Sequence, residues 1–544
     1  MFNLGKKEIE RFKTSFGEIK DGPFDFEMIG KYFLNKDNSK AYQVLSDRTC
    51  NDLDFEELFT FLDRTTSRVG QQYLYNKLRT ISGDSKNTVR NEEIISQFLQ
   101  NDVLRVKVQQ ELLKLDNFNA YYISSLFQEQ HIRPPKYFFI LKLLSFTSVL
   151  LLMFTLFYPK FIFVLLGVFI INLGIHFWNK KNLFKYLGSI PQLLRLKRVA
   201  FILHKEVLLK KIDPNLGKSI GIINQVRNRM LFFQLEGKLQ GDLAVIFWGT
   251  FELVKTLFLL EPLLLFGVLK RLNTKRKEIE DVFSFVGEVD VLISIASLRK
   301  GVDSFCIPKI NQKDNKIVAE QIYHPLIPNC ITNNIAVSNK SILLTGSNMS
   351  GKTTFIRSVG LNFITGLTIN TGFAKSLTLP VLRLFSAIRI SDDLMNDKSY
   401  YFEEVLTIKE MLEESSNGKP NLFLLDEIFK GTNTVERIAA GKATLSHLSK
   451  NGNIVFVSTH DIELTDLLSE EYELYHFSEI VDNQTVDFDY KLKGGKLKNR
   501  NAIRILEING YPDKVINEAI AISKRLDKIS NVNKNDAKVN GGNN

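Results

Sequence analysis

The chain has 544 residues, of which 44% are hydrophobic and 24% are charged, and its formal net charge is +11. This length predicts several domains, and the basic balance favours anionic partners such as nucleic acid or lipid headgroups. A soluble surface with a basic bias is the plainer alternative. Cys50, Cys306 and Cys330 lie far apart and match neither a metal spacing nor a disulfide framework, which predicts a reducing compartment.

The N-terminal segment, residues 1–45, is charged at its start and lacks the apolar run of a signal peptide. The next segment, residues 46–132, is predicted to be the first part of a helical core. Its apolar residues recur at helical spacing, as in a stripe that faces a core. They are Leu58, Phe61, Leu62, Val69 and Tyr73.

Two apolar runs follow, Tyr137–Tyr158 and Phe161–Trp178, separated by Pro159-Lys160. Each run is close to the roughly 20 residues that a membrane helix needs. A buried hairpin of a soluble core is the alternative, but such a hairpin usually carries a polar stripe. We therefore predict a transmembrane helical hairpin over residues 133–182, with membrane contact over 137–178. Basic residues flank both runs, so two spans would leave both termini on the cytoplasmic side of the cytoplasmic membrane.

Residues 183–304 return to charged helical sequence and are predicted to complete the helical core and its lever. Within them, residues 244–270 form a third apolar stretch that Glu252, Lys255 and Glu261 interrupt. A charge inside a bilayer costs several kcal/mol. We therefore expect a buried or interfacial helix here and not a third span. The basic run Lys270–Lys277 fits a solvated helix face or a phosphate-contacting patch equally well.

The stretch Gly346–Thr353 fits the phosphate-loop pattern G-x-x-x-x-G-K-[ST]. The apolar run Ser341–Thr345 before it predicts a strand, and the residues from Thr354 onward predict a helix, so a chance match is improbable. Lys352 is expected to reach the β- and γ-phosphates of ATP, and Thr353 to bind Mg²⁺. The expected nucleotide-binding residues are Gly346, Ser347, Asn348, Met349, Ser350, Gly351, Lys352, Thr353 and Thr354.

Two further strands are predicted to end in polar residues at the same sheet edge. Asn421–Glu427 ends in two carboxylates, of which Asp426 is expected to hold Mg²⁺ and Glu427 to polarise the attacking water. Ile454–His460 ends in a histidine, which alone would be an ordinary loop residue. After the two preceding motifs, His460 is better interpreted as a γ-phosphate sensor. The ATPase domain is predicted over residues 305–525, and the polar residues 526–544 as a disordered tail.

These motifs resemble the MutS family. Thr345–Phe355 resembles the MutS ATPase loop, Asp426–Thr434 the segment after its second motif, and Ser458–His460 its Ala-Thr-His. Ser391–Leu394, with Ser399 and Glu404, resembles the segment between them. More weakly, residues 52–70 and Val286–Leu292 are similar to the start and end of the MutS helical core.

The resemblance implies an α/β P-loop ATPase domain of ABC/MutS-like type, with a mostly parallel sheet flanked by helices, after an all-α core. It also implies ATP and Mg²⁺ as cofactors and a homodimer in which Ser399 reaches the γ-phosphate bound by the other subunit.

The chain departs from the family pattern in three places. Phe24–Glu27 resembles the aromatic wedge of mismatch readers, but its surroundings are too short for that domain, so an ordinary capped helix start is favoured. Cys330 or Ile331 stands where the family often has an aromatic residue against adenine. Asn433 replaces a serine of the family.

Two functions compete. The first is a membrane-anchored, MutS-like, mismatch-repair-related ATPase that binds duplex DNA through its backbone without mismatch specificity. The second is a membrane-anchored ATP-driven machine that acts on a protein or lipid partner. An ABC transporter is a weak third, because two spans are too few for a translocation path.

Overall fold

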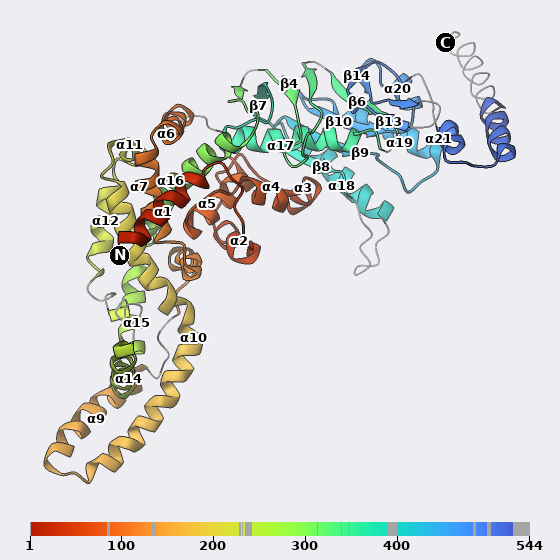
Figure 1. The fold of residues 1–544 in the computed structure, drawn as a ribbon. Helices are drawn as coiled ribbons and strands as arrows, with labels where there is room; N and C mark the ends of the chain where they lie inside the picture. The colour runs from red at the N-terminus through yellow and green to blue at the C-terminus, as the bar shows by residue number, and fades with distance from the viewer. Residues whose placement is uncertain are drawn as a thin grey trace. The chain divides into compact units, whose positions relative to one another are not determined.

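The computed structural model describes residues 2–83, 87–132, 134, 136, 138–227, 230, 232–233, 242–312, 314–338, 340–347, 349–389, 400–481, 486–497 and 502–525. These residues form two compact units (Figure 1). The first comprises Met1–Val44 and Glu56–Asp303, and the second comprises Leu45–Phe55 and Ser304–Asn544. Each unit is described by itself below.

The first unit is helical apart from one short antiparallel pair, β1 (Gln43–Val44) with β2 (Thr80–Ile81). Its shorter helices are α1 (Phe2–Thr14), α2 (Phe26–Leu34), α4 (Phe55–Leu62), α5 (Arg68–Arg79), α6 (Thr88–Gln100), α7 (Asp102–Leu113), the 3-10 helix η1 (Phe118–Ile123), α8 (Ser125–Gln128), α11 (Val207–Lys210) and α12 (Leu216–Asn224). The longer elements, described below, are α9, α10, α14, α15 and α16.

The core of this unit joins the two stretches that weakly resemble the MutS helical core. Asp290, on α16 (Arg276–Gly301), accepts hydrogen bonds from Thr66 N at 2.8 Å, Ser67 N at 2.7 Å and Ser67 Oγ at 2.6 Å. Burial raises the pKa of Asp290 to about 6, although these hydrogen bonds act in the other direction. A Cβ at Gly70 would lie 2.2 Å from Asp290 Oδ2, so only glycine leaves room for this contact.

The start of α2 confirms the predicted capped helix. Asp25 is its N-cap, and its Oδ1 accepts a hydrogen bond from Met28 N at 3.1 Å. The rings of Phe24 and Phe26 lie 6.1 Å and 5.8 Å from the ring of the buried Phe59. Both aromatic residues thus contribute to the packing of the helical unit.

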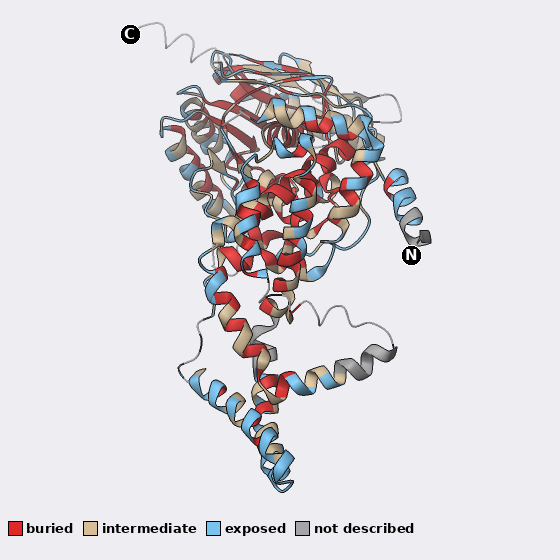
Figure 2. Ribbon diagram, turned by 90° about the vertical axis from the view of Figure 1, so that its left-hand side faces the viewer, coloured by how far each residue is buried: buried red, intermediate tan, exposed pale blue. Residues whose placement is uncertain are grey.

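The hairpin consists of α9 (Phe138–Phe157) and α10 (Phe161–Leu203). In the described residues, Phe138–Phe157 and Phe161–Trp178 are long and apolar enough to cross a membrane, with mean hydropathies of 2.1 and 2.3. Only 17% and 11% of these windows are buried, and their exposed surface is visible in the lower part of Figure 2. The second helix continues to Leu203 without a break, so the boundary predicted at residue 182 lies inside one helix.

The stretch predicted as one helix over residues 244–270 is two helices, α14 (Asp242–Leu257) and α15 (Leu260–Leu272). The break lies at Leu259, which adopts a left-handed backbone conformation with φ of 49°. A residue with a left-handed backbone cannot continue a right-handed helix, and in any residue except glycine this conformation brings Cβ close to the following carbonyl. The prediction of a continuous helix was therefore wrong.

The second unit is built on a six-stranded sheet in the order β14-β11-β6-β10-β9-β8. Every neighbouring pair is parallel except β11 with β14. The strands are β6 (Ser341–Thr345), β8 (Arg383–Ala387), β9 (Asn421–Asp426), β10 (Ile454–Thr459), β11 (Tyr472–His476) and β14 (Lys493–Gly494). The expected mostly parallel sheet is thus present.

Helices cover both faces of this sheet. On one face, α18 (Tyr400–Ser415), α19 (Thr434–Leu448) and α20 (Glu463–Leu467) contribute to a buried cluster with Phe423 and Val457. On the other, α17 (Lys352–Ile369) approaches so closely that a Cβ at Gly360 would lie 2.7 Å from Leu424 Cδ1. The helix α21 (Ala502–Ile508) follows near the C-terminus.

Smaller strands complete the unit. A four-stranded sheet has the order β3-β7-β4-β5, and β12 pairs with β13. Their bounds are β3 (Lys309–Asn311), β4 (Ile317–Ile322), β5 (Asn333–Val337), β7 (Ser376–Pro380), β12 (Glu479–Val481) and β13 (Val486–Phe488).

The segment Leu45–Phe55, with α3 (Asp47–Asp52), belongs to the second unit, although residues 46–132 were predicted to start the helical core. The buried Asp52 accepts hydrogen bonds from Ser386 Oγ at 2.6 Å, Ile388 N at 3.0 Å and Arg389 N at 2.8 Å. These contacts hold α3 against the end of β8 and explain the different boundary.

Candidate active site

The three sequence motifs lie at the carboxyl ends of neighbouring strands in the six-stranded sheet. Strand β10 lies between β6 and β9, and all three are parallel. Thr459 is in register with Thr345, and Ser458 with Asp426. The residues after these positions therefore emerge side by side, where ligands of open α/β sheets bind.

The loop after β6 surrounds the lysine of the phosphate-loop motif. Lys352 is 3% exposed, and its Nζ donates hydrogen bonds to Gly346 O and Ser347 O, both at 2.8 Å. Burial lowers the pKa of this ammonium, while Glu427 and Asp426 act in the opposite direction. Gly351, with φ of 104°, turns the chain into α17, a conformation that other residues rarely adopt.

Asp426 and Thr353 place two oxygen ligands together. Thr353 Oγ1 donates a hydrogen bond to Asp426 Oδ2 at 2.7 Å, and Ser458 Oγ donates one to Asp426 Oδ1. In the described part of the chain, no group of three or more His, Cys, Asp or Glu side chains is placed to hold a metal ion. Mg²⁺ in nucleotide sites uses few protein ligands and completes its shell with water and phosphate oxygens. The hydroxyl and carboxylate pair therefore fits Mg²⁺ bound together with a nucleotide.

Glu427 joins His460 and Lys430. His460 Nε2 contacts Glu427 Oε1, and Lys430 Nζ lies 3.0 Å from Glu427 Oε2. Burial acts to raise the pKa of Glu427, but the hydrogen bonds from His460 and Lys430 outweigh it and lower the pKa to about 2. Glu427 has a left-handed backbone, with φ of 54°, and its N–H donates to Ser458 O at 3.0 Å. A strained backbone at a carboxylate beside a phosphate loop is typical of functional sites.

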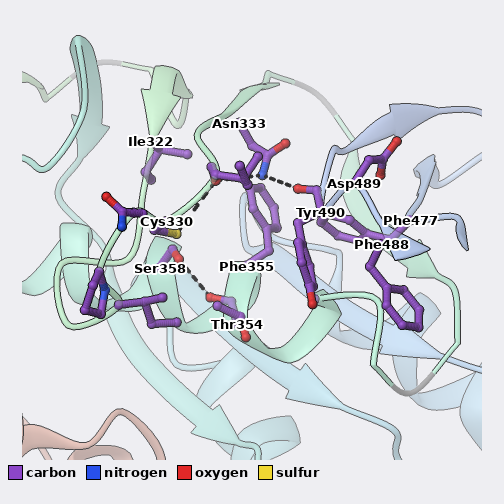
Figure 3. A pocket seen from close by; sticks show the side chains of 15 residues that line it. Ile322, Cys330, Asn333, Thr354, Phe355, Ser358, Phe477, Phe488, Asp489 and Tyr490 are labelled. Carbon is purple, nitrogen blue, oxygen red and sulfur yellow. Dashed lines mark hydrogen bonds between the residues drawn. The ribbon is translucent and has the colours of Figure 1, made fainter. Parts of the chain in front are cut away.

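A cavity of about 670 Å³ opens beside the first turn of α17 (Figure 3). This volume is in the range of small-molecule sites. Cys330 and Ile331 both line it, as does Thr354; one of the first two stands where the family often has an aromatic residue against adenine. In Figure 3, Cys330 and Tyr490 lie on opposite walls of this cavity. The walls are linked by a hydrogen bond from Asn333 Nδ2 to Tyr490 O at 3.0 Å.

Sequence reasoning missed the aromatic wall of this cavity. Phe488 and Tyr490 lie far along the chain from the phosphate loop, and no motif marks them. Yet a Cβ at Gly351 would be 3.2 Å from Tyr490 Cδ1, so the tyrosine ring touches the loop itself. Tyr490 provides the flat face that neither Cys330 nor Ile331 offers.

Two further contacts support the catalytic edge. Arg437, on α19, forms a two-point ion pair with Asp461, with distances of 2.8 Å and 2.6 Å, directly after His460. Glu404, on α18, accepts a hydrogen bond from Phe429 N, close to Glu427. Both fix loops that carry predicted site residues.

The remaining predicted residues are placed as follows. Ser350 is buried and its Oγ donates to Ser347 O at 2.8 Å, whereas Met349 is exposed. Asn348, Ser399 and the stretch 391–394 lie outside the described residues. Their predicted roles therefore stay predictions.

A buried lysine inside a glycine-containing loop, with an aspartate, a glutamate and a histidine at the neighbouring strand ends, defines an α/β domain of the ATPase-associated class. The model of MutS domain V matches residues 342–527 of this chain. In this region the chain is similar to the MutS family.

Individual relatives agree with this match. DNA mismatch repair protein MutS from Thermotoga maritima is 33% identical over 221 residues, which cover 39% of this chain and 28% of the relative. The protein of that name from Aquifex pyrophilus is 30% identical over 256 residues, covering 45% and 29%. That from Petrotoga mobilis is 29% identical over 289 residues, covering 49% and 35%. The chain thus spans about a third of the length of these relatives.

Proposed function

We propose that the second unit is a P-loop ATPase that hydrolyses ATP to ADP and phosphate with Mg²⁺. The observation that carries this proposal is the position of Lys352, whose buried ammonium binds two loop carbonyls at 2.8 Å. A buried cation held by neutral carbonyls of its own loop is well suited to an incoming polyphosphate, which offers full negative charges.

The other residues divide the chemistry. Thr353 and Asp426 would hold Mg²⁺, which neutralises charge on the phosphates when bound. Glu427 would orient and polarise the attacking water. His460, which contacts Glu427, would also contact the γ-phosphate and so act as its sensor. The cavity beside α17 would receive the nucleoside, with the base against Tyr490.

Two substitutions test this assignment. Lys352→Ala should weaken ATP binding, because it removes the charge on the phosphates. Glu427→Gln should leave binding intact and slow hydrolysis by roughly 10²–10⁴-fold, the usual contribution of a positioned base. Binding is measured with a fluorescent ATP analogue and hydrolysis by phosphate release from the purified full chain. Hydrolysis by Glu427→Gln at the native rate would disprove the role of Glu427.

We further propose that the hairpin anchors the protein in the cytoplasmic membrane, with both termini and the ATPase in the cytoplasm. The second apolar run begins at Phe161 and ends at Trp178, and both residues are exposed. At 1.5 Å per residue the run spans about 26 Å, close to the thickness of a hydrocarbon core. The exposed Tyr158 and Trp178 are aromatic residues of the kind that marks the two interfaces of a membrane. Extraction by carbonate alone would contradict this anchor.

The substrate of the machine is proposed to be duplex DNA, bound through its backbone and without mismatch specificity. The net charge of +11 and the family relationship favour DNA. The burial of Phe59 against Phe24 and Phe26 gives those aromatic residues a packing role, and so leaves them unsuited to reading base pairs. An ATP-driven machine on a protein or lipid partner is the alternative, favoured by the exposed hairpin.

Duplex binding separates the two. We expect weak binding by the detergent-solubilised full chain that falls steeply with salt as counterions are released, and that a mismatch changes little. No binding at low salt would favour the protein or lipid partner. A clear preference for a mismatch would reveal a base-reading element.

A further inference from the structure

Four ionisable side chains meet where α14 and α15 contact the hairpin. His176 Nε2 lies 3.0 Å from Glu252 Oε1, and its Nδ1 lies 3.8 Å from Glu261 Oε2. Lys255 Nζ lies 2.7 Å from Glu252 Oε2 and 3.6 Å from Glu261 Oε2. We call these four residues the charge cluster. His176, Lys255 and Glu261 are almost fully buried.

The cluster is electrically balanced when His176 carries a proton. Nε2 of His176 is within hydrogen-bonding distance of Glu252, and Nδ1 faces Glu261 at 3.8 Å, so both carboxylates would attract a positive charge on the ring. Two carboxylates, one ammonium and one imidazolium then sum to zero. A balanced and mutually paired group is the form in which ionisable residues are tolerated within a membrane, where they face neighbouring helices and not lipid.

The contacts of the turn between α14 and α15 show how far along the hairpin this turn reaches. Asn172 Nδ2 donates hydrogen bonds to Leu257 O, the last residue of α14, at 2.7 Å and to Ser148 Oγ on α9 at 3.2 Å. Asn172 lies six positions before Trp178, hence about 9 Å deeper along α10. The turn between α14 and α15 is therefore level with the apolar part of both hairpin helices.

The outward surface at this level is apolar. Leu253 and Val254, on α14, are exposed, while the charges on the same helix point toward the hairpin. On the other side, the ring of Phe138, at the start of α9, lies 5.3 Å from that of Phe266 on α15. The helices α14 and α15 thus expose apolar side chains and direct their charged side chains toward the hairpin, whereas a helix pair that faces water does the reverse.

We infer that the turn between α14 and α15 enters the cytoplasmic leaflet as a re-entrant element, docked on the hairpin through the charge cluster, with Leu253 and Val254 facing acyl chains. This inference rests on the proposed membrane anchor. The charges of Glu252, Lys255 and Glu261 are compatible with this position, because they are paired with one another and with His176.

The test uses full-length protein in phospholipid vesicles, with Cys50, Cys306 and Cys330 replaced by alanine. Single nitroxide labels are attached through Phe154→Cys in the hairpin, Leu253→Cys in α14 and Val207→Cys in the exposed part of α11. Power-saturation electron spin resonance then compares access of oxygen, which concentrates in acyl chains, with access of an aqueous nickel chelate.

We expect the labels at positions 154 and 253 to favour oxygen and the label at 207 to favour nickel. Oxygen preference at 154 with nickel preference at 253 would overturn the re-entrant element and leave the anchor standing. Nickel preference at both positions would overturn the anchor and the inference together.

Charge counting supplies a second test in the same vesicles. His176→Phe removes one positive charge from the cluster and should shift the label at 253 toward nickel access by several-fold. Adding Glu261→Gln restores the balance and should restore oxygen preference. Equal access in the single and double variants would show that the cluster does not hold this element in the bilayer.

Discussion

At the scale of single residues, the site is held together by its own polar groups. Lys352 binds loop carbonyls, Thr353 binds Asp426, and His460 binds Glu427. The side-chain atoms in these contacts are the ones that would bind a nucleotide and Mg²⁺. Nucleotide binding would therefore replace these protein partners with phosphate oxygens and the metal ion. Such an exchange keeps the buried groups satisfied in both states.

The low pKa of Glu427 gives a prediction about pH. Its ordinary pKa is 4.5 and its pKa in the protein is about 2, so the carboxylate stays charged as pH falls through 4.5 and loses its ion pairs only near 2. Lys430→Met removes the ammonium at 3.0 Å and should move the acid limb of the ATPase profile to higher pH. The rate is measured in short assays between pH 2 and 9, so that the range reaches the pKa of Glu427.

Lys409→Met serves as the control for this profile. Lys409 is paired with Glu413 on the surface of α18, away from Glu427. Its replacement should leave the acid limb where it is. Identical limbs for the native protein and Lys430→Met would contradict the role given to Lys430.

Gly70 makes a prediction about stability. Its missing side chain leaves room for Asp290, and a methyl group there would displace the carboxylate from Thr66 and Ser67. Gly70→Ala should destabilise the protein by roughly 2–4 kcal/mol, because buried donors lose their acceptor. Thermal unfolding in detergent, followed by circular dichroism, should show a clearly lower midpoint.

Gly217→Ala is the matched control, since a Cβ at Gly217 in α12 meets no atom within 4 Å. An alanine in an open helical position is neutral or stabilises the helix by about 0.5–1 kcal/mol. Equal midpoints for the two variants would mean that Asp290 adjusts without loss.

At the scale of elements, capping explains one departure from the family pattern. Asn433 is the N-cap of α19, and its Oδ1 accepts a hydrogen bond from Glu436 N at 3.0 Å. Serine and asparagine are both favoured at this position because each offers a side-chain oxygen to the first free N–H groups. The replacement of serine by asparagine therefore preserves the start of the helix that follows Glu427.

We predict that Asn433→Ala loosens the first turn of α19, whereas Asn433→Ser leaves it intact. Loss of a cap costs about 1 kcal/mol, or roughly a five-fold faster local opening. Hydrogen exchange of the peptide around residues 430–440 measures this directly. Equal exchange in Asn433→Ala and Asn433→Ser would show that the side chain is not needed as a cap.

At the scale of the whole molecule, the proposed catalytic assembly is a homodimer with composite sites. The phosphate loop lies at the carboxyl end of β6. Ser399, the residue expected to complete the nucleotide site, is proposed to act on the nucleotide of the other subunit. Closed two-fold symmetry would place two such sites in one interface.

Mixing variants tests this assembly. Chains with Ser399→Arg keep Lys352, and chains with Lys352→Ala keep Ser399. A heterodimer of the two therefore has one site with both residues and one site with neither. Each variant alone should be inactive. Each heterodimer should recover about half of the native ATPase rate, so a freely assorted equimolar mixture should recover about a quarter of it. Heterodimers that form but stay inactive would show that Ser399 does not act across the interface.

Local sequence was enough for the strands β6, β9 and β10, the phosphate loop and the two apolar helices, because their signals lie within short windows. Apolar runs of strand length, a fixed glycine and lysine spacing and an uninterrupted apolar stretch each depend on near neighbours. The start of α2 was likewise predictable, since Asp25 and Met28 are three residues apart.

Only the tertiary structure could decide the contacts between distant segments. Tyr490 reaches Gly351, Asp52 reaches the end of β8, and Asp290 reaches Gly70. In sequence the charges at 252, 255 and 261 argue against a third span, and their partner His176, which lies far away along the chain, is identified only by the structure. Whether a charge is tolerated depends on what neutralises it in space, and a one-dimensional pattern does not contain that distance.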